Sequence, residues 1–319
     1  MKKTINKEHI EGRVYEHNLS IKKVQNESSK NFGKEFISGT LDIATDEDCM
    51  NIVTIHYTYV TEITAAGKKN NTYTALKSII ESGKTVVTDG KDNATKVKAD
   101  TSIALNDFYS DKAKSDVNPE GLVPPKRNEG GFVSVVTSLN EDENARNTFE
   151  LDMLLNGTRF VEADEEKKLP EYLLLKGVAF NFRNDILPME LPIRDPKGIQ
   201  YFQNLGIAKD NMVFTKVWGH VVSNQTKITK TEEAAFGEDK VVEYTRTHKE
   251  WLVENTLKVP YELGDAETGI TVEELQKAVE NRNVYLADVK KRKDEYQANK
   301  AVAPAAQAGV SAAMGGFNF

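Results

Sequence analysis

The chain has 319 residues, of which 39% are hydrophobic and 29% are charged, a composition typical of folded domains with apolar cores. A wholly disordered chain is therefore excluded, and the length allows two domains. No segment approaches the roughly 18 uninterrupted apolar residues of a membrane-spanning helix, and no apolar stretch of a signal peptide follows residues 1–8. Cys49 is the only cysteine, which excludes an intrachain disulfide and cysteine-ligated metal clusters. We expect a protein of the cytoplasm that does not contact membranes.

The net charge is −7, from 42 basic and 49 acidic side chains. An excess of acid argues against a protein that coats duplex nucleic acid by charge alone. Residues 1–128 carry one excess positive charge, whereas residues 129–319 carry eight excess negative charges. The amino-terminal half is therefore the less acidic one, and a local basic groove is compatible with this balance.

The first part of the chain alternates between β-branched or apolar residues and polar ones, which predicts strands. The expected strands are Gly12–Val24, Glu35–Thr45, Asn51–Thr64, Thr95–Leu105 and Gly131–Leu139. A helix is predicted over Asn71–Glu81, between the third and fourth strands, and Ser82-Gly83 is a plausible helix stop. The element order is three strands, one helix and two strands.

The same order follows the acidic stretch at residues 140–144. The expected strands of this second block are Thr148–Ala163, Tyr172–Arg183, Leu187–Arg194, Met212–Thr229 and Lys240–Glu254. A short helix over Pro196–Leu205 begins with proline and stops at Gly206. Each block also has a glycine inside its second strand, Gly39 and Gly177, where a bulge or a tight coil would need one.

The carboxyl-terminal part has a different composition. Residues Thr271 to Glu274 form a capping box, and the apolar residues that follow have near-helical spacing as far as about Gln297. These apolar residues are Val272, Leu275, Val279, Leu286 and Val289. Residues 298–319 are rich in alanine and glycine and end in Phe317 and Phe319, which predicts a flexible tail with an aromatic docking end. The helix has to bury its apolar stripe against its own domains or against another chain, so it is a candidate for self-association.

A five-stranded order with one helix between strands three and four is the element order of the OB-fold, which binds oligonucleotides on the face of its middle strands. Two such blocks, followed by a helix and a tail that ends in aromatics, resemble the single-stranded-DNA-binding proteins of bacteriophages. The resemblance covers roughly residues 10–255 and lies in the architecture. The tail departs from this family, because only Phe317 and Phe319 match its usual acidic and aromatic ending.

The predicted fold is therefore mainly β, with two OB-like five-stranded barrels, a long amphipathic helix and a flexible tail. The expected parts are a first barrel at 1–141, a second barrel at 142–262, the helix at 263–297 and the tail at 298–319. The resemblance implies sequence-tolerant binding of single-stranded DNA in phage replication or recombination, in the cytoplasm of a host cell. It also implies replication or recombination proteins as partners of the tail.

Enzyme signatures are not convincing in this sequence. The segment Ser78–Thr85 imitates a phosphate-binding loop, but serine replaces the first glycine and the segment follows a helix, so it is better interpreted as a helix stop. The five histidines never stand three or four residues apart, as metal ligands on one helix do. The acidic stretch Asp46-Glu47-Asp48 lacks the glycine and the distal glutamate of a calcium loop. We therefore expect no catalysis, no metal and no cofactor.

A stronger pattern for nucleic-acid binding lies in Met212–Val222. Three valines and a threonine at odd positions, 213, 215, 217 and 221, form an apolar face, so the opposite face presents Phe214, Lys216, Trp218 and His220. The hairpin partner repeats the pattern with Tyr244, Arg246 and His248. Aromatic rings for bases and cations for phosphates are what single-stranded nucleic acid requires. In the alternative register, Phe214 and Trp218 line the barrel core and the valines face outwards.

The first block adds two tyrosines and several lysines. Tyr57 and Tyr59 share a face with Val53 and Ile55, so they are either stacking residues or members of the core and its rim. The lysines that would form a phosphate track are Lys22, Lys23, Lys30, Lys34, Lys68, Lys69, Lys96 and Lys98. If these lysines do not converge on one groove, they are ordinary solvated surface. Phe180 and Phe182 share parity with Leu174 and Val178, which predicts core positions.

A rival function comes from a different class of protein. β-rich domains with an extended helix and a tail of small residues also suit a structural protein of a virion, in its capsid or tail. Retention on single-stranded DNA that weakens as salt rises would distinguish the two hypotheses, and duplex DNA is expected to bind more weakly than single strands.

Overall fold

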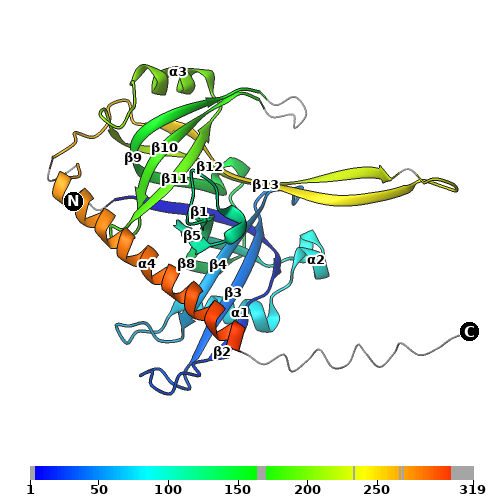
Figure 1. The fold of residues 1–319 in the computed structure, drawn as a ribbon. Coiled ribbons are helices and arrows are strands. Elements are labelled where there is room, and N and C mark those ends of the chain that lie inside the picture. Colours follow the sequence, from blue (N-terminus) through cyan, green and yellow to red (C-terminus); the bar gives the residue numbers. More distant parts are fainter. Residues whose placement is uncertain (1–3, 164–169, 233, 266, 268, 303–319) are drawn as a thin grey trace, which may run out of the picture. The chain divides into compact units, whose positions relative to one another are not determined.

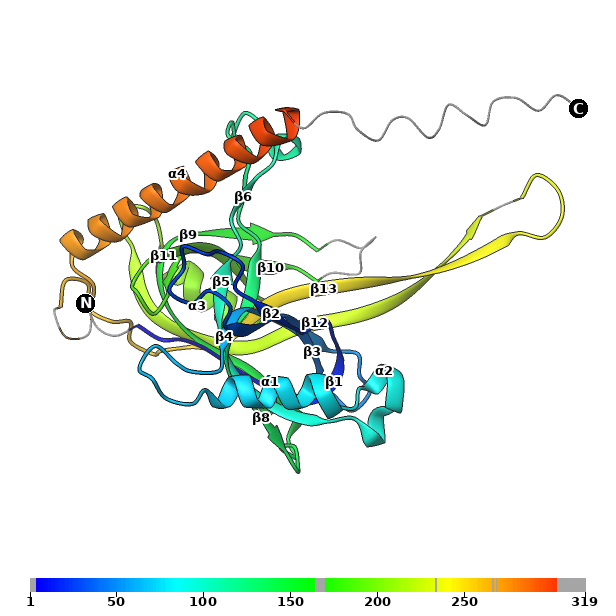
Figure 2. The same ribbon diagram turned by 90° about the horizontal axis from the view of Figure 1, so that it is seen from below.

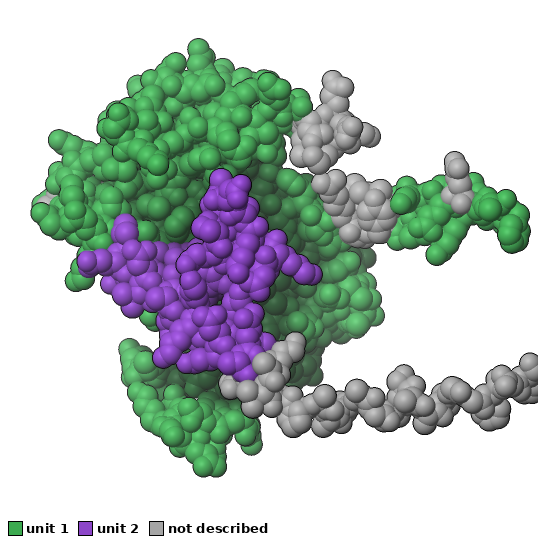
Figure 3. All heavy atoms as spheres, viewed as in Figure 1, with its two compact units in different colours: residues 1–105, 126–278 green, residues 106–125, 279–319 purple. Residues whose placement is uncertain are grey.

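The computed structural model describes residues 4–163, 170–232, 234–265, 267 and 269–302. For residues 226–228, 244–246 and 299–302 only the backbone is described. The chain forms two compact units, which Figure 3 distinguishes by colour. The first unit contains residues 1–105 and 126–278, and the second contains residues 106–125 and the chain from Val279 onward. The four-part division expected from the sequence stays a prediction.

The first barrel consists of five strands whose hydrogen-bonded order closes on itself. The strands are β1 (Asn6–His17), β3 (Glu35–Ala44), β4 (Ile52–Thr61), β5 (Lys96–Leu105) and β8 (Lys126–Val136). β1 pairs with β3, β3 with β4, β4 with β8 in parallel, β8 with β5, and β5 again with β1. The short strand β2 (Ser20–Lys23) pairs with β3. This is the strand order expected for an OB-fold.

The second barrel repeats this order. Its strands are β9 (Asn147–Val161), β10 (Tyr172–Phe180), β11 (Ile186–Ile193), β12 (Val213–Glu232) and β13 (Lys240–Thr256). β11 pairs with β13 in parallel, as β4 does with β8, and the other four pairings are antiparallel. The hairpin of β12 and β13, drawn in yellow, extends well beyond the barrel in Figures 1 and 2. The predicted fold class, two OB-like barrels followed by a carboxyl-terminal helix, is confirmed.

Each barrel has a helix of at least nine residues between its third and fourth strands. In the first barrel α1 (Asn71–Ser82) buries Tyr73, Leu76 and Ile79 and packs against β8, β3 and β4, next to which it lies in Figure 2. The side chain of Asn70 caps its start and Gly83 follows its end, so the segment that imitates a phosphate loop is a helix terminus. In the second barrel α3 (Pro196–Asn204) is capped by Asp195.

The remaining elements are short, apart from the last helix. They are α2 (Val86–Asp89), η1 (Lys91–Asn93), β6 (Phe108–Tyr109), η2 (Asp111–Ala113), β7 (Leu122–Val123), η3 (Glu143–Ala145) and α4 (Val272–Val302). The predicted capping box of α4 is present, because Thr271 Oγ1 accepts a hydrogen bond from the Glu274 backbone and the Glu274 carboxylate accepts one from Thr271 N–H.

The two glycines predicted at bulges both lie at shifts of strand register. Gly39 has a φ of 134°, and a Cβ on it would lie 2.5 Å from the carbonyl oxygen of Asn18. A Cβ on Gly177 would lie 2.2 Å from the carbonyl oxygen of Leu154. Any larger side chain would therefore push the neighbouring backbone away, which explains the glycines.

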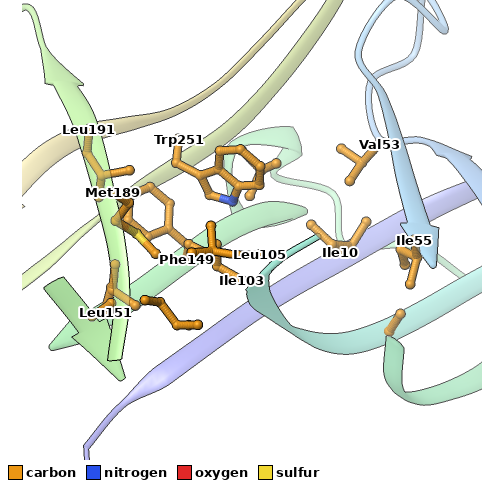
Figure 4. Close-up of a cluster of buried hydrophobic side chains, with 14 of the residues drawn as sticks. Ile10, Val53, Ile55, Ile103, Leu105, Phe149, Leu151, Met189, Leu191 and Trp251 are labelled. Atoms are coloured by element: carbon orange, nitrogen blue, oxygen red, sulfur yellow. The ribbon is translucent and has the colours of Figure 1, made fainter. Parts of the chain in front are cut away.

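The barrels are joined through their first strands. β1 pairs with β9 from Asn6, opposite Leu151, to Ile10, opposite Asn147, so the described strands of both barrels belong to one eleven-stranded sheet. β1 begins six residues before the expected strand Gly12–Val24, and that expected strand covers the end of β1 and all of β2. Buried side chains of both barrels form one continuous cluster, in which Figure 4 shows Trp251 between residues of the two barrels.

A buried carboxyl group lies at this junction. The side chain of Glu8 is fully buried and accepts hydrogen bonds from Thr101 Oγ1 and Trp251 Nε1, each 2.6 Å long. Because removal from water disfavours the ionised carboxylate, burial raises the pKa of Glu8 from 4.5 to about 7. The three residues come from β1, β5 and β13, so Glu8 links the first barrel to the second.

In the second unit, α4 packs on the loop that connects β5 to β8. Arg282 donates two hydrogen bonds of 2.7 and 2.5 Å to Asp107, and both side chains are buried. Lys290 pairs with Glu120 and Lys293 with Asp111, nearer the surface. The apolar stripe expected on this helix is only partly buried, since Val272 is 69% and Val279 is 41% exposed.

The first prediction concerns the pH dependence of unfolding. Since the pKa of Glu8 is higher in the folded state than its ordinary 4.5, folding takes up a proton between pH 4.5 and about 7, and stability falls as the pH rises through this range. In Glu8→Gln the amide oxygen can accept from Trp251 Nε1 and the amide NH2 can donate to Thr101 Oγ1, so both contacts are kept without a charge. Above pH 7 we expect the variant to be more stable than the parent, by on the order of 3 kcal/mol.

Urea denaturation at several pH values measures this difference. Burial lowers the pKa of His17 and of His56, so the difference between variant and parent is the informative quantity. The two curves should converge below pH 4.5. Parallel curves over the whole range would show that Glu8 ionises normally.

The second prediction concerns the ion pair of the second unit. Arg282→Ala leaves the buried carboxylate of Asp107 without its guanidinium, a change that costs about 3–5 kcal/mol in buried pairs. We expect rapid hydrogen exchange in residues 106–125 and 279–298 of the variant, without a change in β9 to β13. Lys290→Ala is the control, because its pair is exposed and should contribute little. Equal exchange in both variants would show that the buried pair does not hold α4 on the loop of residues 106–125.

Candidate nucleic-acid interface

A hollow with a volume of about 880 Å³ opens on the first barrel. The loop between β2 and β3 forms one wall, and the end of β4 with the loop that follows it forms the other. Both loops are closed by hydrogen-bonded turns with a glycine in the left-handed region, Gly33 and Gly67, each with a φ of 76°. The hollow therefore has defined walls on both sides.

An exposed aromatic ring lies in this hollow. Tyr59, at the end of β4, is 47% exposed, and its ring centre is 4.8 Å from that of Phe36 on β3. The Asn31 side chain donates a hydrogen bond of 3.4 Å to the Tyr59 hydroxyl. Phe32, in the loop beside Asn31, is 53% exposed. The ring of Tyr59 thus packs on Phe36, while nearly half of the residue remains accessible to solvent.

Tyr57 and Tyr59 do not share a face, contrary to the expectation. Tyr57 is 3% exposed and belongs to the barrel core, where burial raises the pKa of its hydroxyl. The register moves from Ile37 opposite Val60 to Gly39 opposite Tyr57, so β4 has one extra residue between these pairs. Such a bulge reverses the alternation of side chains, which sends Tyr59 outwards. The prediction that Tyr57 is a stacking residue is therefore wrong, and its alternative, a core position, is the observed one.

Two of the predicted lysines line the hollow, and four others lie on β2 and on the second loop. Lys30 and Lys34 line it, and the Lys34 ammonium donates a hydrogen bond of 3.1 Å to the Asn31 side chain. Lys68 and Lys69 are exposed on the second loop. Lys22 and Lys23 are exposed on the neighbouring strand β2. Acidic residues are present as well, because Glu35 and Glu62 belong to the lining and Lys23 lies 3.9 Å from Glu35.

The second group of predicted residues lies on β12. Val217 and Val221 are buried in the barrel, so the first of the two registers considered above is the observed one. Lys216, Trp218 and His220 occupy the outer face, where each is partly exposed.

Phe214 lies on the same outer face but is fully buried. It packs with Leu154, Phe180 and Tyr261 in a second apolar cluster outside the barrel. The chain after β13 returns over this part of β12, where Tyr261 N–H donates a hydrogen bond of 2.8 Å to the Phe214 carbonyl. The prediction that Phe214 is a stacking residue is therefore wrong, because this later segment covers its side chain.

The cations of the β12 face have carboxylate partners. The Lys216 ammonium lies 3.1 Å from Glu150 and 5.4 Å from the ring centre of Trp218. His220 Nδ1 lies 2.8 Å from the Glu254 carboxylate. Both cations of this face are therefore already paired with carboxylates.

The other predicted residues are dispersed. His248 is exposed on β13 and lies 2.9 Å from Glu250. Lys96 and Lys98 lie on β5, outside the lining of the hollow. The side chains of Tyr244 and Arg246, and the whole of Phe317 and Phe319, lie outside the described part of the chain.

Some of the exposed aromatic residues were missed by sequence reasoning. Phe32 lies between Lys30 and Lys34 in the sequence and is 53% exposed, and Phe132 on β8 is 75% exposed. Phe36, which packs on Tyr59, is half-buried. An available signal was the triplet Asn31-Phe32-Gly33, an aromatic residue in a lysine-containing turn. Phe182 is 87% exposed at the turn between β10 and β11, so its expected core position is wrong, whereas Phe180 is buried as expected.

Within the described residues, no group of three or more histidine, cysteine or acidic side chains is arranged to hold a metal ion. In the same part of the chain, no helix combines the length and the apolar character that crossing a bilayer requires.

Comparisons with known proteins identify a family and a similarity to solved structures. No relative was found among the curated proteins. Among solved structures, the chain is similar to a deletion mutant of the single-stranded DNA binding protein from Thermus aquaticus, with 9% identity and a TM-score of 0.45, over 84% of this chain and 100% of that one. The model of the YorF family matches residues 5–298. The chain therefore belongs to the YorF family.

Proposed function

We propose that the chain binds single-stranded DNA in the hollow of the first barrel. The observation that carries this proposal is the exposed ring of Tyr59, supported by Phe36 and placed beside Lys30 and Lys34. A base can stack on the ring while its phosphates contact the lysines. Stacking does not depend on which base is present, so the binding is tolerant of sequence.

The same chemistry selects against duplex DNA. Bases in a duplex are already stacked on one another and cannot reach the ring of Tyr59 without unpairing. Binding to a duplex would then depend on charge alone, which a net charge of −7 disfavours. Unpaired strands are therefore the preferred ligand.

The wider functional context belongs to the same proposal. It includes a part in phage replication or recombination, location in the cytoplasm, and recruitment of partner proteins by Phe317 and Phe319. The binding mode needs no cofactor and no catalytic step, because stacking and ion pairing form without covalent chemistry.

The third prediction tests the stacking platform. Tyr59→Ala removes one stacked base, a loss of about 1–3 kcal/mol, so affinity for oligothymidylate should fall roughly 5-fold to 150-fold. Fluorescence anisotropy with a labelled oligonucleotide measures the change. The control is Tyr296→Ala, because Tyr296 is 69% exposed on α4. Unchanged affinity in the Tyr59 variant, with the parent binding well, would exclude the hollow as the site.

The fourth prediction tests the phosphate contacts. Replacing Lys30 and Lys34 together by glutamine removes two phosphate contacts, each of which adds about 0.7 to the slope of log affinity against log salt on single strands. The slope should decrease by about 1.4. The control is Lys277→Gln with Lys291→Gln, two exposed lysines of α4. A slope equal to that of the parent would show that phosphates lie elsewhere.

A further inference from the structure

The pairing of β1 with β9 creates a sheet face that crosses both barrels. Residues directly opposite each other on paired strands share a face. Phe132 lies opposite Asp100, Asp100 opposite His9, His9 opposite Thr148, and Thr148 opposite His220. One row of side chains thus runs through β8, β5, β1, β9 and β12. At a strand spacing of about 4.8 Å, the four steps of this row span ~19 Å.

Neighbouring rows belong to the same face, which we call the shared face. Lys98 lies beside this row on β5, opposite Ser134 and Glu11. On the other side, Lys7 lies opposite Glu150, and Glu150 lies opposite Trp218. Lys98 and Trp218, from two separate groups of predicted residues, are therefore parts of one surface.

The shared face has aromatic rings at its two ends. Phe132 is 75% exposed on β8 of the first barrel, and Trp218 is partly exposed on β12 of the second. The residues between them are polar, namely Asp100, His9 and Thr148. A surface that docks a protein has a contiguous apolar centre. Isolated rings separated by polar side chains suit the alternating bases and phosphates of a single strand better.

The charges of the shared face are mixed. Lys7 lies 3.9 Å from Asp100, and Lys216, next to Trp218, lies 3.1 Å from Glu150. His9 lies 3.3 Å from both Asp100 and Glu11. Lys98 is exposed beside Phe132 on the adjoining strand. Phosphates on this face would compete with carboxylates for the lysines, so its contribution should be smaller than that of the hollow.

The shared face is built on a rigid base. The hydrogen-bonded pairing of β1 and β9 runs directly beneath it, and on the opposite side of β1 the buried Glu8 bonds to Thr101 and Trp251. The two aromatic ends are thereby held at a fixed separation. A bound strand can therefore contact both rings without a hinge motion of the protein, and only the strand loses conformational freedom on binding.

We propose that the shared face is a second contact surface for single-stranded DNA, which engages strands long enough to extend beyond the hollow. The inference rests on the proposed function, since it assigns a further surface to the same ligand. The first barrel holds a short segment at Tyr59, and the shared face adds contacts on both barrels. Affinity should therefore increase with strand length in a way that depends on Phe132 and Trp218.

The fifth prediction compares two lengths of oligothymidylate, of about 8 and about 30 nucleotides, a choice guided by the site sizes of OB-folds. In Phe132→Ala with Trp218→Ala, affinity for the long strand should fall at least about tenfold, while affinity for the short strand stays within about twofold. Tyr59→Ala should weaken both lengths. Phe182→Ala with Tyr296→Ala is the control for the loss of two exposed rings.

A second variant guards against a loss of stability, because Trp218 is partly buried. Phe132→Ala with Lys98→Glu changes only exposed side chains and should weaken binding of the long strand in the same selective way. Equal affinity of both double variants and the parent for the long strand would overturn the inference and leave the hollow in place. Equal loss on both lengths would overturn it too, and failure of the parent to bind either strand would refute the proposed function itself.

Discussion

The pairing of β1 with β9 is the constraint on which the arrangement of both barrels depends. Each of these strands is the first strand of its own barrel and is also the neighbour of the other barrel's first strand. Side chains on one side of β1 must therefore fill a continuous core, and those on the other side must remain compatible with water. Glu8 lies on the core side, where Thr101 and Trp251 satisfy both of its oxygens. This junction makes one compact unit of two barrels that could each close alone.

The order of the elements could be predicted from the sequence, because it depends on local patterns. Strand alternation, the capped helices and the glycines at the bulges are all visible within a few residues. The start of β1 was not predicted, since Lys7, Glu8 and Glu11 make Asn6–Glu11 look like a polar terminus. A glutamate is almost never fully buried without partners, and its two donors are 93 and 243 residues away in the sequence.

The candidate site was harder to predict, because exposure depends on contacts between distant segments. Phe214 and Trp218 have the same parity on β12, but the chain near Tyr261 covers only the first. Tyr57 and Tyr59 also have the same parity, but the bulge in β4 separates them. Gly39 predicted a bulge in the pairing of β3 with β4, but a glycine does not indicate which of the two strands has the extra residue. The lysines are visible in the sequence, whereas the hollow that Lys30 and Lys34 line could not be predicted from it.

The acidic residues beside the lysines have a physical consequence for any bound strand. Glu35 and Glu62 line the hollow with Lys30 and Lys34, and Glu150 already pairs with Lys216. A phosphate gains less from a lysine that has a carboxylate partner, because it must replace that partner or share the charge with it. Stacking, which these carboxylates do not weaken, then contributes a larger share of the affinity. In the proposed binding mode, such a surface would discriminate between free and paired bases better than a strongly basic one, since charge attracts both forms of DNA and exposed rings attract only the unpaired form.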